Sequence, residues 1–531
     1  MPSPYLRRAV QLFFILVFLV LFVTTTYRGG NEVHYPINVF FQIDPLAALG
    51  NILATKSFAG FVDFFLPSII IVLATIVIGR FFCGWICPVG GVLDLLRPVL
   101  YGGRVKSKGA ERGQWLKDTK FPKSLKYYLL IVILIPTLFS VNLTGLFDPL
   151  SIAIRSLTIV IYPLFSSTAF SIFNLLFQFD LPAVTPVTDA TYAFLSKTVL
   201  PFGQGFFALS IFSLAVFLGI VIAERIRPRF WCRYLCPLGA VLSIFATFSF
   251  LKRTPTRLCK DCRECSDNCI MDAFSDYEEG GEFLKGECIL TEDCVTYCEK
   301  GRAKNTVSLK SIWSNIGGGR SDIKRRYVIT SAIAGLFIHP LLSVLPVRKL
   351  KKGGGITYLI RPPGAAEEAE FIERCIKCTE CMMVCPTGGL QPDLAMGGIE
   401  SIYSPVLVPR IGYCEYLCTL CGQVCPTDAI RELTVGEKRE TVIGKAYIDT
   451  DRCLPWAYNV NCIVCEEHCP TEDKAIKYHD WKEGDEPSWD GSPLKKPYVI
   501  YDLCVGCGIC ENKCPVGGRA AIVVTSMKEE I

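Results

Sequence analysis

Residues 324–347 read KRRYVITSAIAGLFIHPLLSVLPV, in which three basic residues precede a run of about twenty residues without a charge. A helix of this length crosses a hydrocarbon core of roughly 30 Å. The chain before it is strongly hydrophobic and ends in a short cysteine-rich patch, whereas the chain after it is more polar and carries sixteen of the 27 cysteines. The sequence therefore predicts a transmembrane helix at 324–347 that separates two different halves.

The overall composition also indicates a membrane part. The 531 residues are 51% hydrophobic with a mean hydropathy of +0.36, which is too apolar for an ordinary soluble protein and too long for one domain. The net charge is only +5, and the basic residues form short clusters beside apolar stretches, a pattern typical of topology signals. We therefore expect membrane lipid as a partner and no nucleic acid.

Nearly all cysteines fall into short Cys-x2-Cys and Cys-x3-Cys-Pro runs. Cysteines this close together form strained disulfides but suit metal binding. The chain has no Cys-x-x-Cys-His string, so we expect no haem, and its only histidines are His34, His339, His468 and His479. The sequence predicts iron-sulfur clusters as the redox groups.

Residues 1–250 contain the apolar runs of a polytopic α-helical membrane domain. The first two runs lie at 9–26 and 61–78, and a basic loop follows the second, which places this loop and the N-terminus in the cytoplasm. A third helix is expected to begin near Tyr127 and a fourth to end near Glu224. Residues 151–204 either lie in the membrane surface or hold an extra helix pair.

Two pairs of similar strings indicate that this domain is an internal duplication. FFCGWICPVG at residues 81–90 is repeated almost position for position by FWCRYLCPLG at residues 230–239. FQIDPL at residues 41–46 is echoed by LFDPL at residues 146–150.

Each of the longer strings holds two cysteines four residues apart, which face the same way on a helix. If the duplication folds with two-fold symmetry, all four cysteines meet around one cluster at the inner face. Alternatively they act as redox thiols, or each pair is structural or binds adventitious metal. The cysteines concerned are Cys83, Cys87, Cys232 and Cys236.

Each of the shorter strings contains an Asp-Pro pair, at Asp44 and Asp148. One interpretation is an N-cap aspartate followed by proline at the first helical position. The other is a carboxylate that takes protons from quinol at the outer face. His339, inside the 324–347 helix, is a third candidate for proton transfer, with helix packing as its alternative role.

Residues 251–310 are predicted to form a cytoplasmic two-cluster ferredoxin-like domain with an incomplete second site. Its first run has the Cys-x2-Cys-x2-Cys-x3-Cys spacing of bacterial ferredoxins. In the second run Thr291 stands where a ligand belongs, so the site holds a [3Fe-4S] cluster, or takes a ligand from Glu292, Asp293 or an outside group, or is empty and leaves Cys298 to serve the first cluster. The two runs comprise Cys259, Cys262, Cys265 and Cys269, and then Cys288, Cys294 and Cys298.

Residues 355–531 contain four complete runs of four cysteines, each ending in Cys-Pro. Zinc has no use for a third cysteine two residues after a Cys-x2-Cys pair and a fourth before proline, so the runs indicate four [4Fe-4S] clusters in an α+β polyferredoxin domain. The ligands are expected to be Cys375, Cys378, Cys381 and Cys385; Cys414, Cys418, Cys421 and Cys425; Cys453, Cys462, Cys465 and Cys469; and Cys504, Cys507, Cys510 and Cys514.

These motifs resemble those of the ferredoxin-type electron-transfer proteins of periplasmic nitrate reduction and methylamine utilisation, the NapH/NapG and MauN/MauM type. The first 300 residues resemble the membrane member with its paired Cys-x3-Cys-Pro strings. From Lys324 onward the chain resembles the exported member, with twin arginines at Arg325 and Arg326 and the stretch LIRPPGA at residues 359–365. The two members are fused here, so the export signal has become a retained anchor.

The resemblance implies that electrons pass from the quinol pool through the clusters to a periplasmic oxidoreductase or carrier, which would make the chain a quinol dehydrogenase subunit of the inner membrane with its four-cluster domain in the periplasm. It also implies a pairing in which the first run exchanges its last cysteine with the fourth, and the second with the third. Two other functions fit the same motifs: a maturation factor for a periplasmic redox enzyme, and a relay subunit of a larger respiratory complex without its own quinone site.

Overall fold

The computed structural model describes residues 4–57, 64–100, 121–179, 185–201, 205–254, 269–274, 282–296, 298, 304–307, 323–344, 359–394, 396–479 and 487–526. These residues form two compact units that alternate along the chain. The helical unit comprises Met1–Phe22, Ile37–Ser156 and Ile211–Pro340, and the ferredoxin unit comprises Val23–Pro36, Leu157–Ser210 and Leu341–Ile531.

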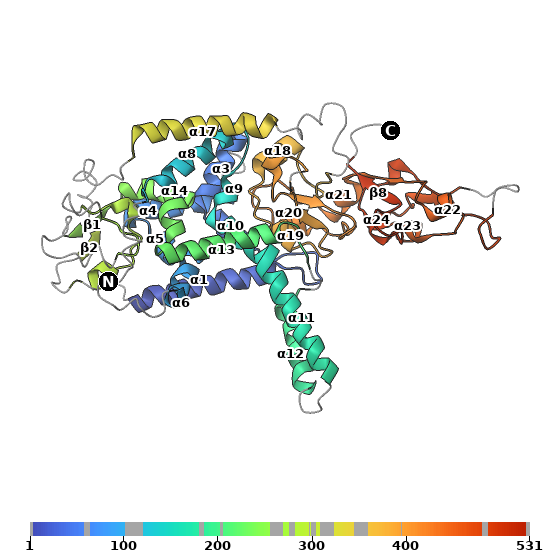
Figure 1. Cartoon of the computed structure of the whole chain (residues 1–531), viewed down its shortest axis with the longest axis horizontal. Helices are drawn as coiled ribbons and strands as arrows, with labels where there is room; N and C mark the ends of the chain where they lie inside the picture. Colours follow the sequence, from blue (N-terminus) through green and yellow to red (C-terminus); the bar gives the residue numbers. More distant parts are fainter. Residues whose placement is uncertain are drawn as a thin grey trace. The chain divides into compact units, whose positions relative to one another are not determined.

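The helical unit is built around helix α14, which contacts α3, α4 and α8 and the short turn η6 (Figure 1). Residues of α14 such as Leu238, Ala240 and Leu242 are at most 1% exposed, so this helix forms the centre of the core. The elements of the unit are α1 (Pro4–Thr25), α2 (Val39–Gln42), α3 (Pro45–Thr55), α4 (Leu66–Ile78), α5 (Phe81–Trp85), α6 (Pro88–Leu100), α8 (Leu125–Leu138), α9 (Thr144–Phe147), α10 (Pro149–Ser156), α13 (Ser210–Ile226), η4 (Trp231–Leu235), α14 (Pro237–Thr247), η6 (Lys285–Glu287), α16 (Asp293–Thr296), α17 (Arg325–Val344), and the paired strands β1 (Leu251–Thr254) and β2 (Lys304–Val307).

The similar strings of the sequence adopt similar local structures. In each longer string a five-residue helical turn that carries the first cysteine leads into a helix that starts at the proline after the second cysteine, α6 in one case and α14 in the other. In each shorter string the helix starts at the proline after the aspartate, α3 and α10. Proline suits the first helical position because its fixed φ is already helical and the position needs no N–H donor.

Among the residues that the structure describes, two helical stretches are long and apolar enough to cross a membrane, Tyr5–Thr25 and Pro149–Phe179. The first agrees with the run predicted at 9–26. The second was not expected as a single span, and it continues from α10 through the π-helical turn η3 (Leu157–Ile161) into α11 (Tyr162–Phe179). Helix α17 lies where the sequence predicted a transmembrane helix at 324–347, but it is not one of these two stretches, so its crossing of a membrane stays a prediction. Helices α3, α4, α8 and α14 are apolar but shorter.

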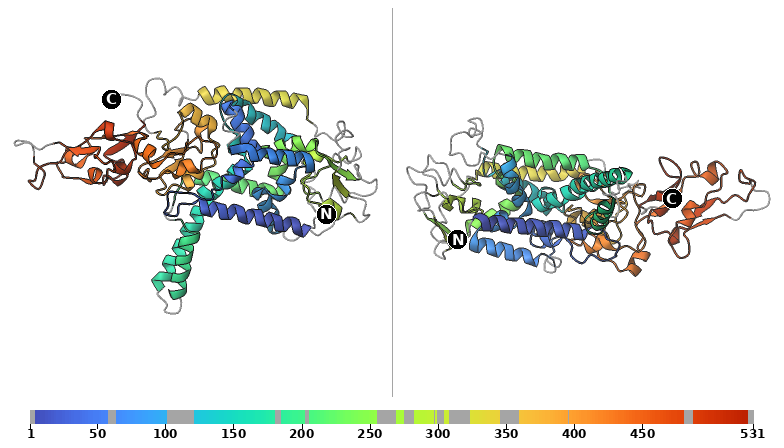
Figure 2. Two further views of the ribbon diagram at one scale, coloured as in Figure 1. Left: turned by 180° about the vertical axis from the view of Figure 1, so that it is seen from behind. Right: turned by 90° about the horizontal axis from the view of Figure 1, so that it is seen from below.

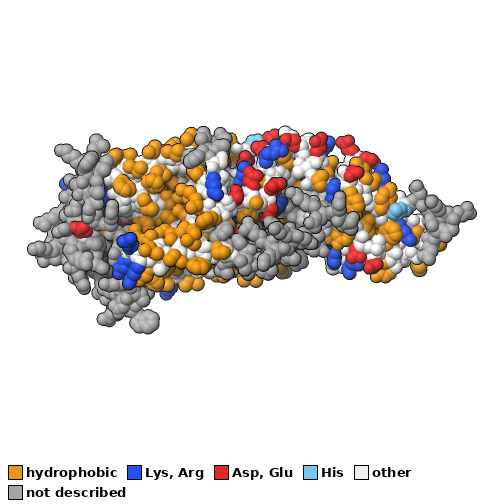
Figure 3. Space-filling model, turned by 90° about the horizontal axis from the view of Figure 1, so that it is seen from above, with side chains coloured by type: hydrophobic (Ala, Val, Ile, Leu, Met, Phe, Trp, Pro, Cys, Tyr) orange, Lys and Arg blue, Asp and Glu red, His pale blue; other side chains and the backbone are white. Residues whose placement is uncertain are grey.

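The surface of the helical unit agrees with a membrane environment. Apolar side chains cover most of the face of the helical unit that Figure 3 shows, and a group of Lys and Arg side chains lies near one end of it. Exposed side chains include Ile70, Leu73 and Phe337, which are 66%, 56% and 70% exposed. Because so much exposed apolar surface is costly in water, this apolar surface is best explained by membrane association.

The ferredoxin unit begins with an antiparallel helix pair, α11 and α12 (Thr185–Thr198), which lie side by side in both views of Figure 2. Of the two interpretations of residues 151–204, the structure therefore shows the helix pair. The segment Val23–Pro36 packs on α20, where Asn31 Oδ1 accepts from the N–H of Thr419 at 2.9 Å and Asn31 O accepts from Gln423 Nε2 at 2.9 Å.

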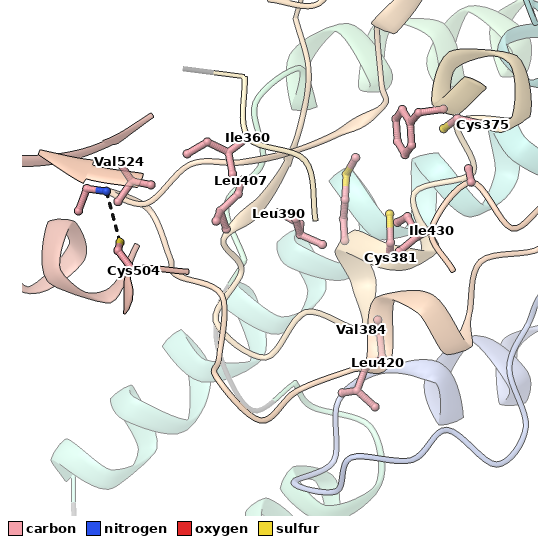
Figure 4. Packing of buried hydrophobic residues seen from close by; sticks show 14 of the residues in the cluster. Ile360, Cys375, Cys381, Val384, Leu390, Leu407, Leu420, Ile430, Cys504 and Val524 are labelled. Atoms are coloured by element: carbon pink, nitrogen blue, oxygen red, sulfur yellow. Dashed lines mark hydrogen bonds between the residues drawn. The ribbon is translucent and has the colours of Figure 1, made fainter. Parts of the chain in front are cut away.

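The rest of the ferredoxin unit is a repeated α+β arrangement, as predicted for a bacterial-ferredoxin-like domain. Short helices alternate with three two-stranded antiparallel sheets, and Ile360, Leu390, Leu407 and Val524 belong to one buried core (Figure 4). The helices are α18 (Glu368–Arg374), α19 (Glu380–Met383), α20 (Leu420–Gln423), α21 (Val435–Glu440), α22 (Leu454–Ala457), α23 (Val464–Glu467) and α24 (Ile509–Lys513), and the sheets pair β3 (Leu390–Pro392) with β4 (Pro405–Leu407), β5 (Lys445–Ile448) with β8 (Ile522–Thr525), and β6 (Ile476–Tyr478) with β7 (Pro497–Val499).

Candidate cluster-binding sites

The first two cysteine runs of the ferredoxin unit exchange their last cysteines. Burial raises the pKa of Cys381, and the next causes are its neighbours Cys378, Cys375 and Cys425. The same reasoning gives the second group, because the pKa of Cys421 is raised by burial and then by Cys414, Cys418 and Cys385. The groups are therefore Cys375, Cys378, Cys381 and Cys425, and Cys414, Cys418, Cys421 and Cys385.

The third and fourth runs are related in the same way. A small cavity of about 20 Å³ is lined by Cys453, Cys462, Cys465 and Cys514. Burial raises the pKa of Cys510, followed by its neighbours in the fourth run and by the last two cysteines of the third. The fourth group is therefore Cys504, Cys507, Cys510 and Cys469.

This pairing corrects the one that the resemblance implied, in which the first run was paired with the fourth. The physical reason lies in the short helices. Helix α19 of the first run packs on α20 of the second, and α23 of the third packs on α24 of the fourth. Each cysteine that follows such a helix is therefore directed to the group held by the neighbouring run.

The surroundings of these groups fit [4Fe-4S] clusters. Backbone N–H groups of Ile430, Ala446 and Ala521 each donate to a cysteine sulfur, at 3.4 Å to Sγ of Cys425, Cys504 and Cys514 respectively. The bond from Ala446 to Cys504 is drawn in Figure 4. N–H donors to cysteine sulfur stabilise the reduced cluster and so raise its reduction potential. When bound, the clusters supply one-electron redox chemistry, and the chain supplies ligands, donors and burial.

The four groups form a continuous series. Cys421 of the second group is among the neighbours of Cys381 in the first. The N–H of Cys414 in the second group donates to the carbonyl oxygen of Cys507 in the fourth at 2.8 Å. Cys465 of the third group is among the neighbours of Cys510 in the fourth. In spatial order the groups therefore follow each other as first, second, fourth and third.

The site at residues 269–298 is described in part, because Cys259, Cys262 and Cys265 lie outside the described residues. Burial raises the pKa of Cys288, and its neighbours Cys269, Cys294 and Glu292 contribute. A cavity of about 10 Å³ is lined by three of these cysteines together with Thr291 and Glu292. Both carboxylate oxygens of Glu292 accept from Asn305 Nδ2 at 3.1 Å, which holds this carboxylate beside the cysteines. Of the ligands proposed in place of Thr291, Glu292 is therefore the one that lines the cavity.

The four cysteines of the longer strings meet in the helical unit. Cys87 interacts electrostatically with Cys83 and Cys232, and Cys236 interacts with the same two residues. All four side chains are between 4% and 8% exposed. The two strings, more than a hundred residues apart in the sequence, thus form one four-cysteine group. This is the arrangement expected if the duplication folds with two-fold symmetry.

Two arginines complete this group, and the sequence reasoning missed both. Arg80 stands three residues before Cys83, and its Nη2 donates to the carbonyl oxygen of Cys232 at 3.2 Å. Arg229 stands three residues before Cys232, and its Nη1 donates to the carbonyl oxygen of Cys83 at 2.6 Å. Each string therefore sends an arginine to the other. The signal was visible as Arg-x2-Cys in both strings, but an arginine beside an apolar run was interpreted as a topology signal.

Both guanidinium groups are fully buried, so each needs a charged partner. Arg229 Nη2 lies 2.7 Å from Asp94 Oδ2, and Arg80 Nη1 lies 3.6 Å from Glu287 Oε2. Glu287 also forms a buried ion pair with Lys126. A cluster held by four thiolates carries a net negative charge, and two buried guanidinium groups beside it fit that charge.

The glycine of each string makes room for the arginine of the other. A Cβ atom on Gly90 would lie 3.1 Å from Arg229 Nη1, and one on Gly239 would lie 2.3 Å from Arg80 Nη2. The requirement for glycine at position 239 thus comes from the close approach of a side chain, and at position 90 the carbonyl oxygen of Cys83, 2.7 Å from the Cβ position, adds to it.

The two Asp-Pro pairs also meet. Asp44 Oδ1 accepts from the N–H of Leu46 at 2.8 Å, and Asp148 Oδ2 accepts from the N–H of Ser151 at 2.6 Å, which confirms the capping interpretation. The two side chains are at most 1% exposed, and one oxygen of each, Asp44 Oδ2 and Asp148 Oδ1, has no hydrogen-bond partner among the described residues. The two groups interact electrostatically, and their burial disfavours two negative charges at this place. The side chain of His339 lies outside the described residues, although α17 carries its backbone.

Comparisons with known proteins agree with this geometry. A family described as "4Fe-4S binding domain" matches residues 62–107 and again 208–255, which include the two longer strings, and a second family with the same description matches residues 497–518. The fold and these matches define an iron-sulfur electron-transfer protein with [4Fe-4S] ferredoxin-type domains.

Two named relatives specify the family. The methylamine utilization ferredoxin-type protein MauM of Paracoccus denitrificans is 34% identical over 31% of this chain and 70% of its own length. The ferredoxin-type protein NapG of Escherichia coli is 33% identical over 29% of this chain and 65% of its own length. The chain belongs to the MauM and NapG family of ferredoxin-type proteins.

The glycine at position 239 provides a test of the arginine exchange. In Gly239→Ala the new Cβ would displace the guanidinium group of Arg80, and we expect a loss of about 1–3 kcal/mol of stability, typical of overpacking. Gly219→Ala in α13 is the matched control, because a Cβ there meets nothing within 4 Å, and alanine favours the helix by up to about 1 kcal/mol. Thermal unfolding of both variants measures the difference. Equal melting temperatures for the two variants would contradict the close approach.

The pairing of the runs can be tested by counting iron. Cys385→Ser combined with Cys414→Ser affects one group, whereas Cys385→Ser combined with Cys504→Ser affects two. We expect the first double variant to lose the iron of one cluster and the second to lose the iron of two, because each cluster needs its full set of thiolates. Iron and acid-labile sulfide analysis on anaerobically purified protein gives the counts. The opposite result would restore the pairing of the first run with the fourth.

Proposed function

We propose that this chain takes electrons from a quinol of the membrane and passes them singly through its [4Fe-4S] clusters to an oxidoreductase or carrier outside the inner membrane. The continuous series of four-cysteine groups in the ferredoxin unit carries this proposal. An isolated structural metal site needs no neighbour, whereas electron transfer needs redox groups in close succession. Contacts between consecutive groups, such as the hydrogen bond from Cys414 to Cys507, supply that succession.

The full set of clusters follows from the cysteine groups. We propose four clusters in the ferredoxin unit and one held by Cys83, Cys87, Cys232 and Cys236. One or two further clusters would lie between residues 259 and 298, and one of these is either complete or of the [3Fe-4S] composition, because Thr291 replaces a ligand. Donors to sulfur, burial and the neighbouring charges would set their relative potentials. The chain itself performs no bond chemistry on the acceptor.

The membrane arrangement is part of the proposal. A multi-pass helical domain of the inner membrane anchors the chain, and α17 crosses to carry the four-cluster domain into the periplasm. Support comes from the two long apolar helices and from the exposed apolar side chains of the helical unit. The Arg325-Arg326 pair at the start of α17 resembles a twin-arginine export signal.

Quinol oxidation also releases two protons. Asp44 and Asp148 are buried and interact electrostatically, and we propose that this pair carries protons toward the outer face. His339 is the third residue proposed for this task because ionisable groups within a membrane helix commonly serve proton transfer.

The direct test adds a reduced menaquinol analogue to the purified full chain under anaerobic conditions and follows the clusters by electron paramagnetic resonance. We expect quinol to reduce clusters that dithionite also reduces. Asp44→Asn keeps a side chain that can cap α3 but cannot exchange a proton, so it should slow reduction by quinol about 10²-fold or more. Asp189→Asn, on the exposed side of α12, is the control and should react as the unchanged protein does.

Two outcomes would count against these proposals in different ways. Clusters that dithionite reduces and quinol does not would contradict quinol oxidation and support the relay or maturation function. Clusters that quinol reduces equally fast in Asp44→Asn and in the unchanged protein would contradict only the proton relay.

A further inference from the structure

The ferredoxin unit contains a cavity of about 80 Å³ between the start of α11 and the loop that follows α19. The two elements are in direct contact, because α19 packs on η3 and Thr158 Oγ1 lies 3.7 Å from the sulfur of Met383. Hydroxyl groups of Tyr27, Tyr162 and Ser166 belong to the lining, and Met383 and other apolar side chains complete it. An apolar wall with a few polar groups is the usual composition of a small-molecule site.

A cysteine of the second group forms part of this wall. Cys385 lines the cavity together with Pro386, and it is grouped with Cys414, Cys418 and Cys421. A molecule in the cavity would therefore touch a residue of the cluster site itself.

The same cavity borders a helix whose outer surface is apolar. Helix α11 continues the apolar stretch Pro149–Phe179, and its side chains Leu164 and Phe165 are 64% and 47% exposed. Ser166, the next residue, is only 1% exposed and lines the cavity. The helix therefore presents an apolar surface on one side and a small polar residue to the cavity on the other.

We propose that this cavity binds the ring of a quinol, with the isoprenoid tail along the apolar surface of α11; the inference rests on the proposed function and names its entry site. The described volume admits the edge of a ring, and the flexible thioether of Met383 can move to enlarge it. Because the hydroxyl groups of Tyr162 and Ser166 already donate to the carbonyl oxygens of Val199 and Pro163, their oxygen atoms would accept hydrogen bonds from the quinol hydroxyls. A bound quinol would give two electrons, one at a time, to the cluster that Cys385 would help to hold, and its two protons to the proton relay proposed above, and it would leave as the quinone.

Photoaffinity labelling tests the site without relying on turnover. The full chain in detergent is irradiated with an azido-substituted short-chain quinone, and labelled peptides are identified by mass spectrometry. We expect the label within residues 157–166 or 382–388, and we expect an excess of the same quinone without the azido group to prevent it. Labelling elsewhere, or labelling that the competitor leaves unchanged, would overturn the proposal.

Filling the cavity tests its role in electron entry. Ser166→Phe, with Ser166→Leu as a smaller second variant, should lose the label and slow the reduction of clusters by decylubiquinol at least about tenfold, while dithionite still reduces them. Ser171→Phe is the matched control, because Ser171 lies exposed on the same helix and should leave both measurements unchanged. Circular dichroism and iron content establish that the variants are folded and loaded.

The possible failures are distinct. If the unchanged protein is not reduced by the quinol, the proposed function fails. If the unchanged protein is reduced and both Ser166 variants are reduced equally fast, the function stands and the assignment of the cavity is overturned.

Discussion

The helical unit depends on an exchange of two buried arginines. Arg80 donates to the carbonyl oxygen of Cys232 and Arg229 to that of Cys83, so neither string is complete without the other. Burying a guanidinium group is costly unless an acidic group nearby balances its charge. That requirement fixes Asp94 beside Arg229 and Glu287 beside Arg80, and it fixes glycine at the two points of close approach. The duplicated strings thereby become one site with four cysteines.

The ferredoxin unit depends on an exchange of cysteines between neighbouring runs. Each group takes three cysteines from one run and its fourth cysteine from the neighbouring run. Two runs must therefore fold together before either group is complete. The short sheets and the small core between them are modest, and the clusters when bound would therefore contribute much of the stability, as metals do in other small domains. The contacts between groups then order the redox sites into a series without long separations.

The sequence predicted the features that depend on local spacing. Residues close together in the chain were enough to predict the α+β class of the ferredoxin unit and the helix α17. They were also enough to predict the capping of α3 by Asp44. What it could not predict depends on distant packing. The pairing of runs is decided by which short helices touch, and the meeting of Asp44 with Asp148 needs both halves of the duplication. The arginines were missed because the same residue before a string also serves as a topology signal, and the long span at 149–179 was missed because a π-helical turn joins two helices that look separate in sequence.

The central claim is that the two strings share one cluster, and iron analysis of Cys83→Ser, Cys232→Ser and the double variant tests it most directly. A shared cluster predicts that each single variant lacks the iron of one cluster and that the double variant lacks no more, with the same resonance missing from all three paramagnetic spectra. A double variant that loses the iron of two separate sites, or three variants that keep all the iron of the unchanged protein, would contradict it.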